Sequence, residues 1–156
     1  PAISEFVNQW VGGIDRLRWA PMEKTLRAAP PTSNAHAPDY PRSASASTLA
    51  AWAATWSGLR SVTVLADGAA VPAPGSALVP MDIFLRGKGL NPLADKLRQA
   101  TDKVDASMAQ VQKTGVQNKD AIPHPAPDLP ALKFLAESEV APAMQVSIGF
   151  SDADGD

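Results

Sequence analysis

Apolar residues recur every three or four positions in several stretches of this chain, and this spacing marks one face of an α-helix. The clearest stretch begins at Asn91, a suitable N-cap, and keeps the spacing for about six turns. Glycines are expected to end three helices, at Gly12 with Gly13, at Gly58 and at Gly115. The predicted helices cover residues 4–10, a short stretch from Pro21, residues 48–57 and the residues from Asn91 to Lys113.

Apolar and polar residues alternate in three other stretches, which is the period of a β-strand with one buried face, and a fourth stretch is rich in β-branched residues. The last of them, up to Phe150, is the most regular. Residues 132–138 also fit a helix, and a strand is favoured there because residues 140–142 would then form a turn. The predicted strands cover Ser61–Ala66, Ala77–Arg86, Leu132–Ser138 and Met144–Phe150.

Together these elements predict an α+β fold. A small, mostly antiparallel sheet of about three to four strands would pack against one long helix, with additional short helices and long proline-rich connectors. The length of 156 residues suits a single domain, residues 1–156, with one core of its own. We expect residues 29–47 to form an extended proline-rich connector and residues 151–156 to form an acidic tail.

The 15 prolines of the chain gather mainly in three connectors. Proline fixes φ and has no backbone N–H, so these segments are not expected to extend a helix or to lie inside a sheet. Segments of this composition become ordered when neighbouring subunits cover them. We therefore expect contacts outside the chain's own fold to hold the three connectors, Ala29–Ser47, Val71–Ala77 and Pro123–Pro130.

Composition narrows the classes of function. A formal net charge of -2 gives no overall attraction to nucleic acid or to acidic membranes. The absence of cysteine excludes a disulfide framework, a thiolate nucleophile and a zinc site with sulfur ligands. The sequence has no apolar run near the roughly 20 residues that a membrane span needs, and it has no recognisable secretion signal. We expect neither a membrane partner nor a specific nucleic acid.

No residue is assigned a catalytic, cofactor-binding or metal-binding role. His36 and His124 lie in proline-rich connectors, where no positioned partner for acid–base chemistry is visible. Residues 152–156 resemble the start of a calcium loop, but the glycine comes too early and the loop is incomplete. Residues 87–89 precede a predicted helix N-terminus that attracts anions in principle, and a flexible turn is the favoured interpretation. We expect that the protein binds no cofactor and is not an enzyme.

Pro1 raises one enzymatic alternative, since a secondary amine can act as a base or nucleophile when its pKa is lowered. Tautomerase-type enzymes work in this way, with the proline at the start of a buried strand beside arginines. Here the first segment is predicted to be a helix, and the nearest arginines follow a double glycine. The expected geometry therefore disfavours a tautomerase-like role for Pro1.

Seven residues are candidates for contacts between subunits. Trp52 and Trp56 share a helix whose other residues are mainly small, so one of them is suited to anchor a partner, although core packing is the favoured role of each. The first 42 residues are rich in arginine and the last residues are acidic, which favours head-to-tail contacts between copies. The candidates are Trp52, Trp56, Tyr40, Arg16, Arg18, Glu137 and Glu139.

The order of the predicted elements resembles that of phage tail-terminator and tail-completion proteins. The resemblance covers a strand ending in residues 81–85, the long helix from Asn91, residues 132–134 and a closing strand over residues 144–150. Those proteins are small α+β subunits that form rings at the neck of a tailed virion. The resemblance implies a structural role in an assembly of this kind.

The sequence thus favours a non-enzymatic structural subunit of a large multi-subunit assembly, a virion or phage-tail-like component with proline-rich arms that contact other subunits. Its expected partners are protein subunits, both copies of itself and other assembly components. Its expected location is a virion or a cytoplasmic assembly. The alternative is a small soluble binding or adaptor protein, and an enzyme that uses Pro1 is the third possibility.

Overall fold

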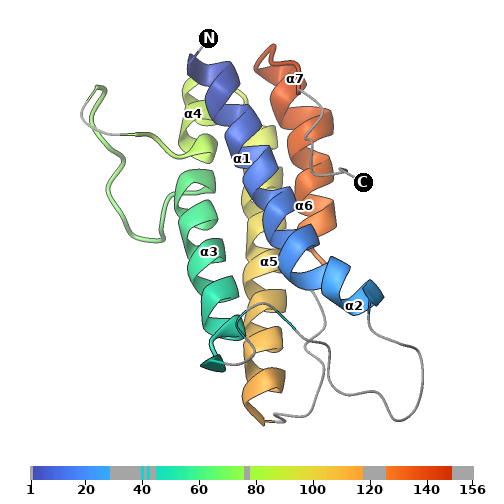
Figure 1. The fold of residues 1–156 in the computed structure, drawn as a ribbon. Coiled ribbons are helices and arrows are strands. Elements are labelled where there is room, and N and C mark those ends of the chain that lie inside the picture. Colours follow the sequence, from blue (N-terminus) through green and yellow to red (C-terminus); the bar gives the residue numbers. More distant parts are fainter. Residues whose placement is uncertain are drawn as a thin grey trace.

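The chain folds as a bundle of helices rather than as a helix packed on a sheet (Figure 1). In this computed structural model the long central helix has the first helix in front of it and other helices on both sides. The predicted α+β fold is wrong, because the described residues contain no β-strand. Those residues are 2–28, 40, 42, 45–75, 78–117 and 126–148.

Seven α-helices and two π-helical turns make up the regular structure of the described residues. In chain order they are α1 (Ala2–Arg18), the π-helical turn η1 (Trp19–Glu23), α2 (Lys24–Ala28), α3 (Thr48–Thr63), α4 (Met81–Gly87), α5 (Asn91–Gln117), α6 (Leu129–Leu135), the π-helical turn η3 (Ala136–Val140) and α7 (Ala141–Ala143).

The predicted helices are present, and three of them are longer than predicted. Helix α1 continues through Gly12 and Gly13 to Arg18, and α3 continues past Gly58 to Thr63. Packing explains the first extension, because a Cβ atom on Gly13 would lie 2.6 Å from Cδ2 of Leu59 on α3. The absence of a side chain there lets α1 and α3 approach closely, and the bundle overrides the weak helix propensity of glycine.

The core is one cluster in which every long helix contributes a face with helical spacing. Helix α5 is in contact with α3, α4 and α6, and α1 is in contact with α3 and α6. The members of the core cluster that come from α1, α3, α5 and α6 are Val7, Trp10, Val11, Ile14 and Leu17 of α1, Trp52 and Trp56 of α3, Ala94, Leu97, Val104, Met108 and Val111 of α5, and Leu129 and Leu132 of α6.

The predicted strand Ala77–Arg86 is wrong, since its second half is helix α4. Met81 and Leu85 are both buried one helical turn apart, so a short apolar run that alternates also fits a helix. Gly89 has φ +78°, and Leu90 N–H donates to Leu85 O in a left-handed cap that turns the chain from α4 into α5. The helix α5 then begins at Asn91 itself.

The predicted strand Leu132–Ser138 is wrong as well, because these residues continue from α6 into η3. Leu132 and Ala136 face the core, whereas Phe134 is 69% exposed, which is the helical rather than the alternating pattern. Pro142 does not turn the chain, since it lies in α7 directly after η3. A proline ring clashes with the carbonyl four residues back, and the wider π-helical turn relieves this clash. The turn η1 likewise contains a proline, Pro21.

The two remaining predicted strands are also wrong. The first half of Ser61–Ala66 is the last turn of α3, which ends at Thr63 and is followed by an extended Val64. In Met144–Phe150, Gln145 has φ +57° and Val146 N–H donates to Ala141 O, so the segment begins as the cap of α7. Residues 146–148 are irregular, and residues 149 and 150 lie outside the described part of the chain.

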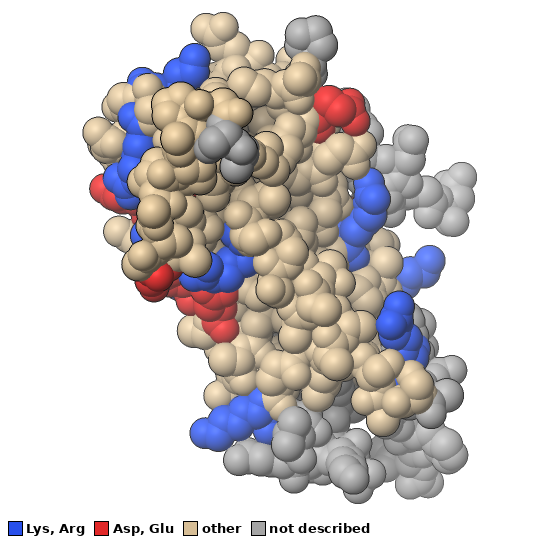
Figure 2. Space-filling model, turned by 90° about the vertical axis from the view of Figure 1, so that its left-hand side faces the viewer, with Lys and Arg blue, Asp and Glu red and all other residues tan. Residues whose placement is uncertain are grey.

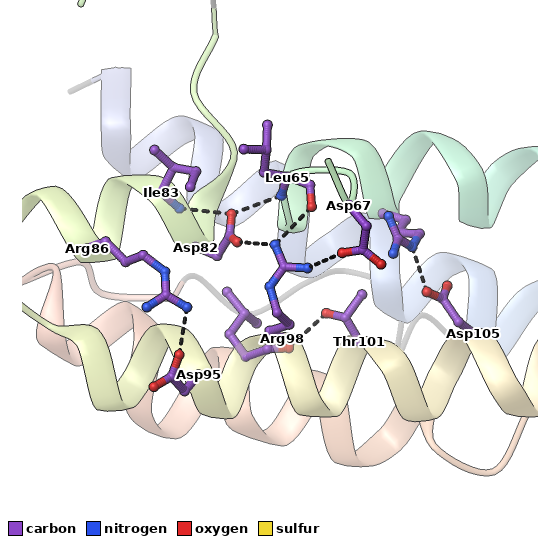
Figure 3. Close-up of polar contacts among 11 residues, drawn as sticks. Leu65, Asp67, Asp82, Ile83, Arg86, Asp95, Arg98, Thr101 and Asp105 are labelled. Atoms are coloured by element: carbon purple, nitrogen blue, oxygen red, sulfur yellow. Dashed lines mark hydrogen bonds and ion pairs between the residues drawn. The ribbon is translucent and has the colours of Figure 1, made fainter. Parts of the chain in front are cut away.

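A buried carboxylate fixes the junction between α3, α4 and α5 (Figure 3). Asp82 is fully buried, and its Oδ1 accepts hydrogen bonds from the backbone N–H groups of Leu65 (3.0 Å) and Ile83 (2.8 Å). Its Oδ2 accepts a hydrogen bond from Arg98 Nη2 at 2.9 Å, and the same guanidinium reaches Leu65 O and Asp67. The three hydrogen bonds of the Asp82 carboxylate therefore all connect parts of the fold.

Candidate functional site

An apolar groove opens at the end of the bundle where α1 begins, and we call it the end groove. It has a volume of about 310 Å³, which is within the lower range of ligand-binding cavities. Three parts of the chain form it: the first turns of α1, the segment before α4 with α4 itself, and the residue after α7. Its lining residues are Ala2, Ile3, Phe6, Leu78, Val79, Met81, Phe84 and Met144.

Among the described residues that line the end groove, no side chain is an acid, base or nucleophile. Leu78 is 67% exposed and Ile3 is 43% exposed, so large apolar side chains stand at its rim. Lys88 lies over the ring of Phe84, with Nζ 5.6 Å from the ring centroid, and adds a charge beside the groove. The groove is therefore suited to hold an apolar side chain of another molecule rather than to perform chemistry.

A second recess of about 400 Å³ lies between α1 and α3, and we call it the arginine recess. Its base is apolar, with the buried Leu17 and Trp52 beside Leu59. Arg16 and Arg42 also line it, and both are exposed. The described lining residues are Gly13, Arg16, Leu17, Pro21, Arg42, Ala51, Trp52, Thr55 and Leu59.

The charged side chains among the described residues of the arginine recess are all positive. None of the nine described residues that line it is acidic. No ion pair joins Arg16 or Arg42 to another residue that the structure describes. Figure 2 shows the side of the molecule on which α3 lies, where charged side chains surround a broad uncharged area. Helix α3 contributes to this area, because Arg60 is its one charged residue.

Arg18 lies in a different environment from Arg16, in a partly buried ion-pair network. Its guanidinium donates to Asp15 at 2.9 Å and to Glu23 at 2.9 Å, and Lys133 of α6 reaches Asp15 at 2.8 Å. Burial alone would raise the pKa of Asp15, but hydrogen bonds from Lys133 and Arg18 outweigh it and lower that pKa. Burial would likewise lower the pKa of Arg18, and its two acidic partners raise it instead.

The two acidic candidates on η3 take part in ion pairs within the chain. Glu139 accepts a hydrogen bond from Lys96 of α5 at 2.7 Å, and Glu137 lies 3.7 Å from Lys133. Both side chains remain partly exposed, so these surface pairs contribute little to stability. Their predicted role in contacts between subunits stays a prediction.

The three aromatic candidates lie in the core of their own chain. Trp52 is 3% exposed, Trp56 is 5% exposed, and Trp56 donates its indole N–H to Asp105 at 2.7 Å. Tyr40 packs edge-on against Trp52, with ring centroids 5.3 Å apart. Burial raises the pKa of Tyr40 to about 12. The described part of the 29–47 connector is thus anchored by its own fold at Tyr40.

Several predicted features lie outside the described residues. Pro1, His36, His124 and the acidic tail 151–156 belong to this group. Residues 87–89, which were predicted to join a strand to a helix, instead join two helices as a cap. Within the described ranges, no group of three or more histidine or acidic side chains is placed to hold a metal ion.

The end groove was missed by sequence reasoning because its residues come from three separate segments. Leu78 falls in the predicted strand Ala77–Arg86, and Phe6 falls in the predicted helix over residues 4–10. In the described part of the chain, no helix has both the length and the apolar character to cross a membrane.

No family model, curated protein or solved structure matches this chain.

Proposed function

We propose that this chain is a non-enzymatic structural subunit of a multi-subunit assembly, in which copies of the chain bind one another through the end groove. The end groove is the observation that carries the proposal. Apolar surface that is hollowed and rimmed by large exposed side chains is typical of surfaces that bind other proteins.

The end groove contains both parts of a self-complementary contact. Leu78 projects from its rim with 67% of its surface exposed, and the apolar hollow beside it has a volume of about 310 Å³. In a two-fold arrangement each copy presents the same patch, so Leu78 of one copy can enter the hollow of the other. Burial of a leucine side chain contributes about 1.5–3 kcal/mol, and the pair contributes it twice.

The use of the charged groups supports a structural rather than an enzymatic role. Asp15 and Asp82, the two buried carboxylates in the described part of the chain, each form ion pairs that connect helices. Neither of them lines the end groove or the arginine recess. The strands on which the resemblance to phage neck proteins depended are helical or irregular, so the proposal does not extend to a particular virion.

Sedimentation velocity of the full chain over a range of concentrations tests the proposal. We expect the average mass to rise with concentration, from one copy towards two or more. A mass of one copy at every concentration would overturn the proposal and would favour the small binding or adaptor protein. Limited proteolysis of the same samples adds a second readout, since cleavage next to Leu78 should slow as the mass rises.

A further inference from the structure

We propose that the arginine recess binds the C-terminal acidic segment, residues 150–156, of a second copy of this chain. This inference rests on the proposed function only in that both require copies of the chain to meet. The recess and the end groove have no lining residue in common. The two contacts can therefore be tested one at a time.

Charge complementarity is the first argument. Residues 151–156 contain three aspartates in alternate positions, Asp152, Asp154 and Asp156, and no basic residue. The recess presents Arg16 and Arg42, and none of the described residues in its lining is acidic. Arginine binds carboxylates through two parallel hydrogen bonds, and the alternation gives each arginine a choice of carboxylate on one side of the segment.

The apolar base of the recess provides the second argument. Phe150 stands directly before the acidic residues. Leu17 and Trp52 are buried beneath the recess and Leu59 is partly buried, so the base offers apolar contact next to the two arginines. An aromatic anchor in an apolar pocket beside charge-assisted hydrogen bonds is a frequent pattern at protein interfaces. The order of Phe150 and the aspartates in the sequence matches this pattern.

The position of α1 favours a second copy over the chain's own tail. Helix α1 is in contact with α3 on one side and with α6 on the other (Figure 1), and the recess is lined by residues of α1 and α3 and not of α6 among the described residues. The last described residues, 146–148, follow α7, and Val146 N–H is bound back to Ala141 O. A segment that leaves from this side would have to pass around α1 to reach its own recess.

The proposed contact joins two different surfaces, so it is a head-to-tail contact. Such a contact continues from copy to copy and forms a ring if the rotation closes or a filament if it does not. The contact at the end groove, in contrast, joins the same surface of two copies. A chain with both contacts can build an assembly larger than a dimer.

The first experiment measures binding of a labelled peptide, residues 146–156, to the full chain by fluorescence anisotropy. We expect saturable binding that weakens about tenfold or more with Arg16→Glu and Arg42→Glu together, because both carboxylate partners are lost. Arg27→Glu is the control for each of the single variants Arg16→Glu and Arg42→Glu, since Arg27 is exposed on α2 outside the recess and each of these changes alters the net charge equally. Equal weakening by the control, or no binding of the peptide, would overturn the inference.

The second experiment tests whether the acidic segment of one copy binds the recess of another. One full chain carries Arg16→Glu with Arg42→Glu, and the other carries Asp152→Lys with Asp154→Lys, both in a Leu78→Asp background that places a charge in the end groove. We expect each chain alone to sediment as one copy and the mixture to form a complex, because the acidic segment of the first chain meets the intact recess of the second. A mixture that stays monomeric would overturn binding between copies. A failure of the end groove alone leaves this result unchanged. The Leu78→Asp chain with its recess and acidic segment intact decides between a second copy and the chain's own tail, because its mass should rise with concentration if the contact joins two copies and should stay that of one copy if the tail binds its own recess.

Discussion

Trp10 of α1 donates its indole N–H to the hydroxyl oxygen of Thr63 at the end of α3, over 2.8 Å. Thr63 is fully buried, and its hydroxyl in turn donates to Leu59 O at 2.7 Å. The side chain of a tryptophan therefore buries its large apolar ring while its one polar atom remains satisfied. This relationship shows how the bundle uses polar atoms to fix the register of two helices.

We expect Thr63→Val to lower the free energy of unfolding by about 1–3 kcal/mol, because it leaves the buried indole N–H of Trp10 without an acceptor. Urea unfolding followed by circular dichroism measures the change. Thr55→Val is the matched control, since Thr55 is exposed and donates within its own helix to Ala51 O. The control should stay within about 0.5 kcal/mol of the parent. Equal losses in both variants would argue against the Trp10 hydrogen bond as the cause.

Asp82→Asn should be much more destabilising than a change in a surface ion pair. The substitution removes the charge that the guanidinium of Arg98 faces in a buried site, and breaking such a pair costs about 3–5 kcal/mol. Asp95→Asn breaks the exposed pair with Arg86 and should cost less than about 1 kcal/mol. Thermal or urea unfolding of the two variants side by side gives the comparison. Similar losses would contradict the buried network.

The lowered pKa of Asp15 predicts a specific loss of stability in acid. The carboxylate form is favoured by folding, so its contribution is fully present well above pH 3.8, the ordinary pKa of the group, and is lost as the pH falls through the lower pKa of the folded state. The difference in unfolding free energy between the parent and Asp15→Asn should therefore shrink below about pH 4. Urea unfolding at a series of pH values measures this difference. A difference that does not change down to strongly acidic pH would contradict the prediction.

Tyr40 is the single tyrosine of the chain, so the absorbance of tyrosinate reports on it alone. In the folded chain we expect it to titrate near 12, because burial disfavours the charged form. In urea it should titrate near the ordinary value of about 10. The stability that the neutral form contributes is present below the unfolded value and is lost as the pH rises from 10 towards 12. A folded-state midpoint near 10 would contradict the packing of Tyr40 on Trp52.

The sequence allowed the helices to be predicted because their apolar spacing continues over several turns. The spacing in residues 91–113 leaves no strand interpretation, and α5 indeed covers them. The strands were wrong for the opposite reason. Runs of five or six residues, such as Met81–Arg86, fit both periods, and only packing against α5 decides between them.

Less of the candidate site than of the helices could be predicted from the sequence. The basic character of the first residues did point to Arg16, which lines the arginine recess. Trp52 and Trp56 were predicted as candidates for contacts between subunits because they are large aromatic residues, and both are buried. The end groove depends on how the segment at Leu78 folds back beside α1, and no periodicity in a sequence carries that information.

Comparison of Leu78→Asp with Val71→Asp by sedimentation velocity tests the central claim most directly. The two side chains are similarly exposed, 67% and 61%, and belong to the same connection between α3 and α4, but only Leu78 lines the end groove. We predict that the parent and Val71→Asp gain mass equally with concentration, whereas Leu78→Asp loses the two-fold contact and gains less. Equal association of all three chains, or equal loss in both variants, would contradict the proposal that copies of this subunit meet through the end groove.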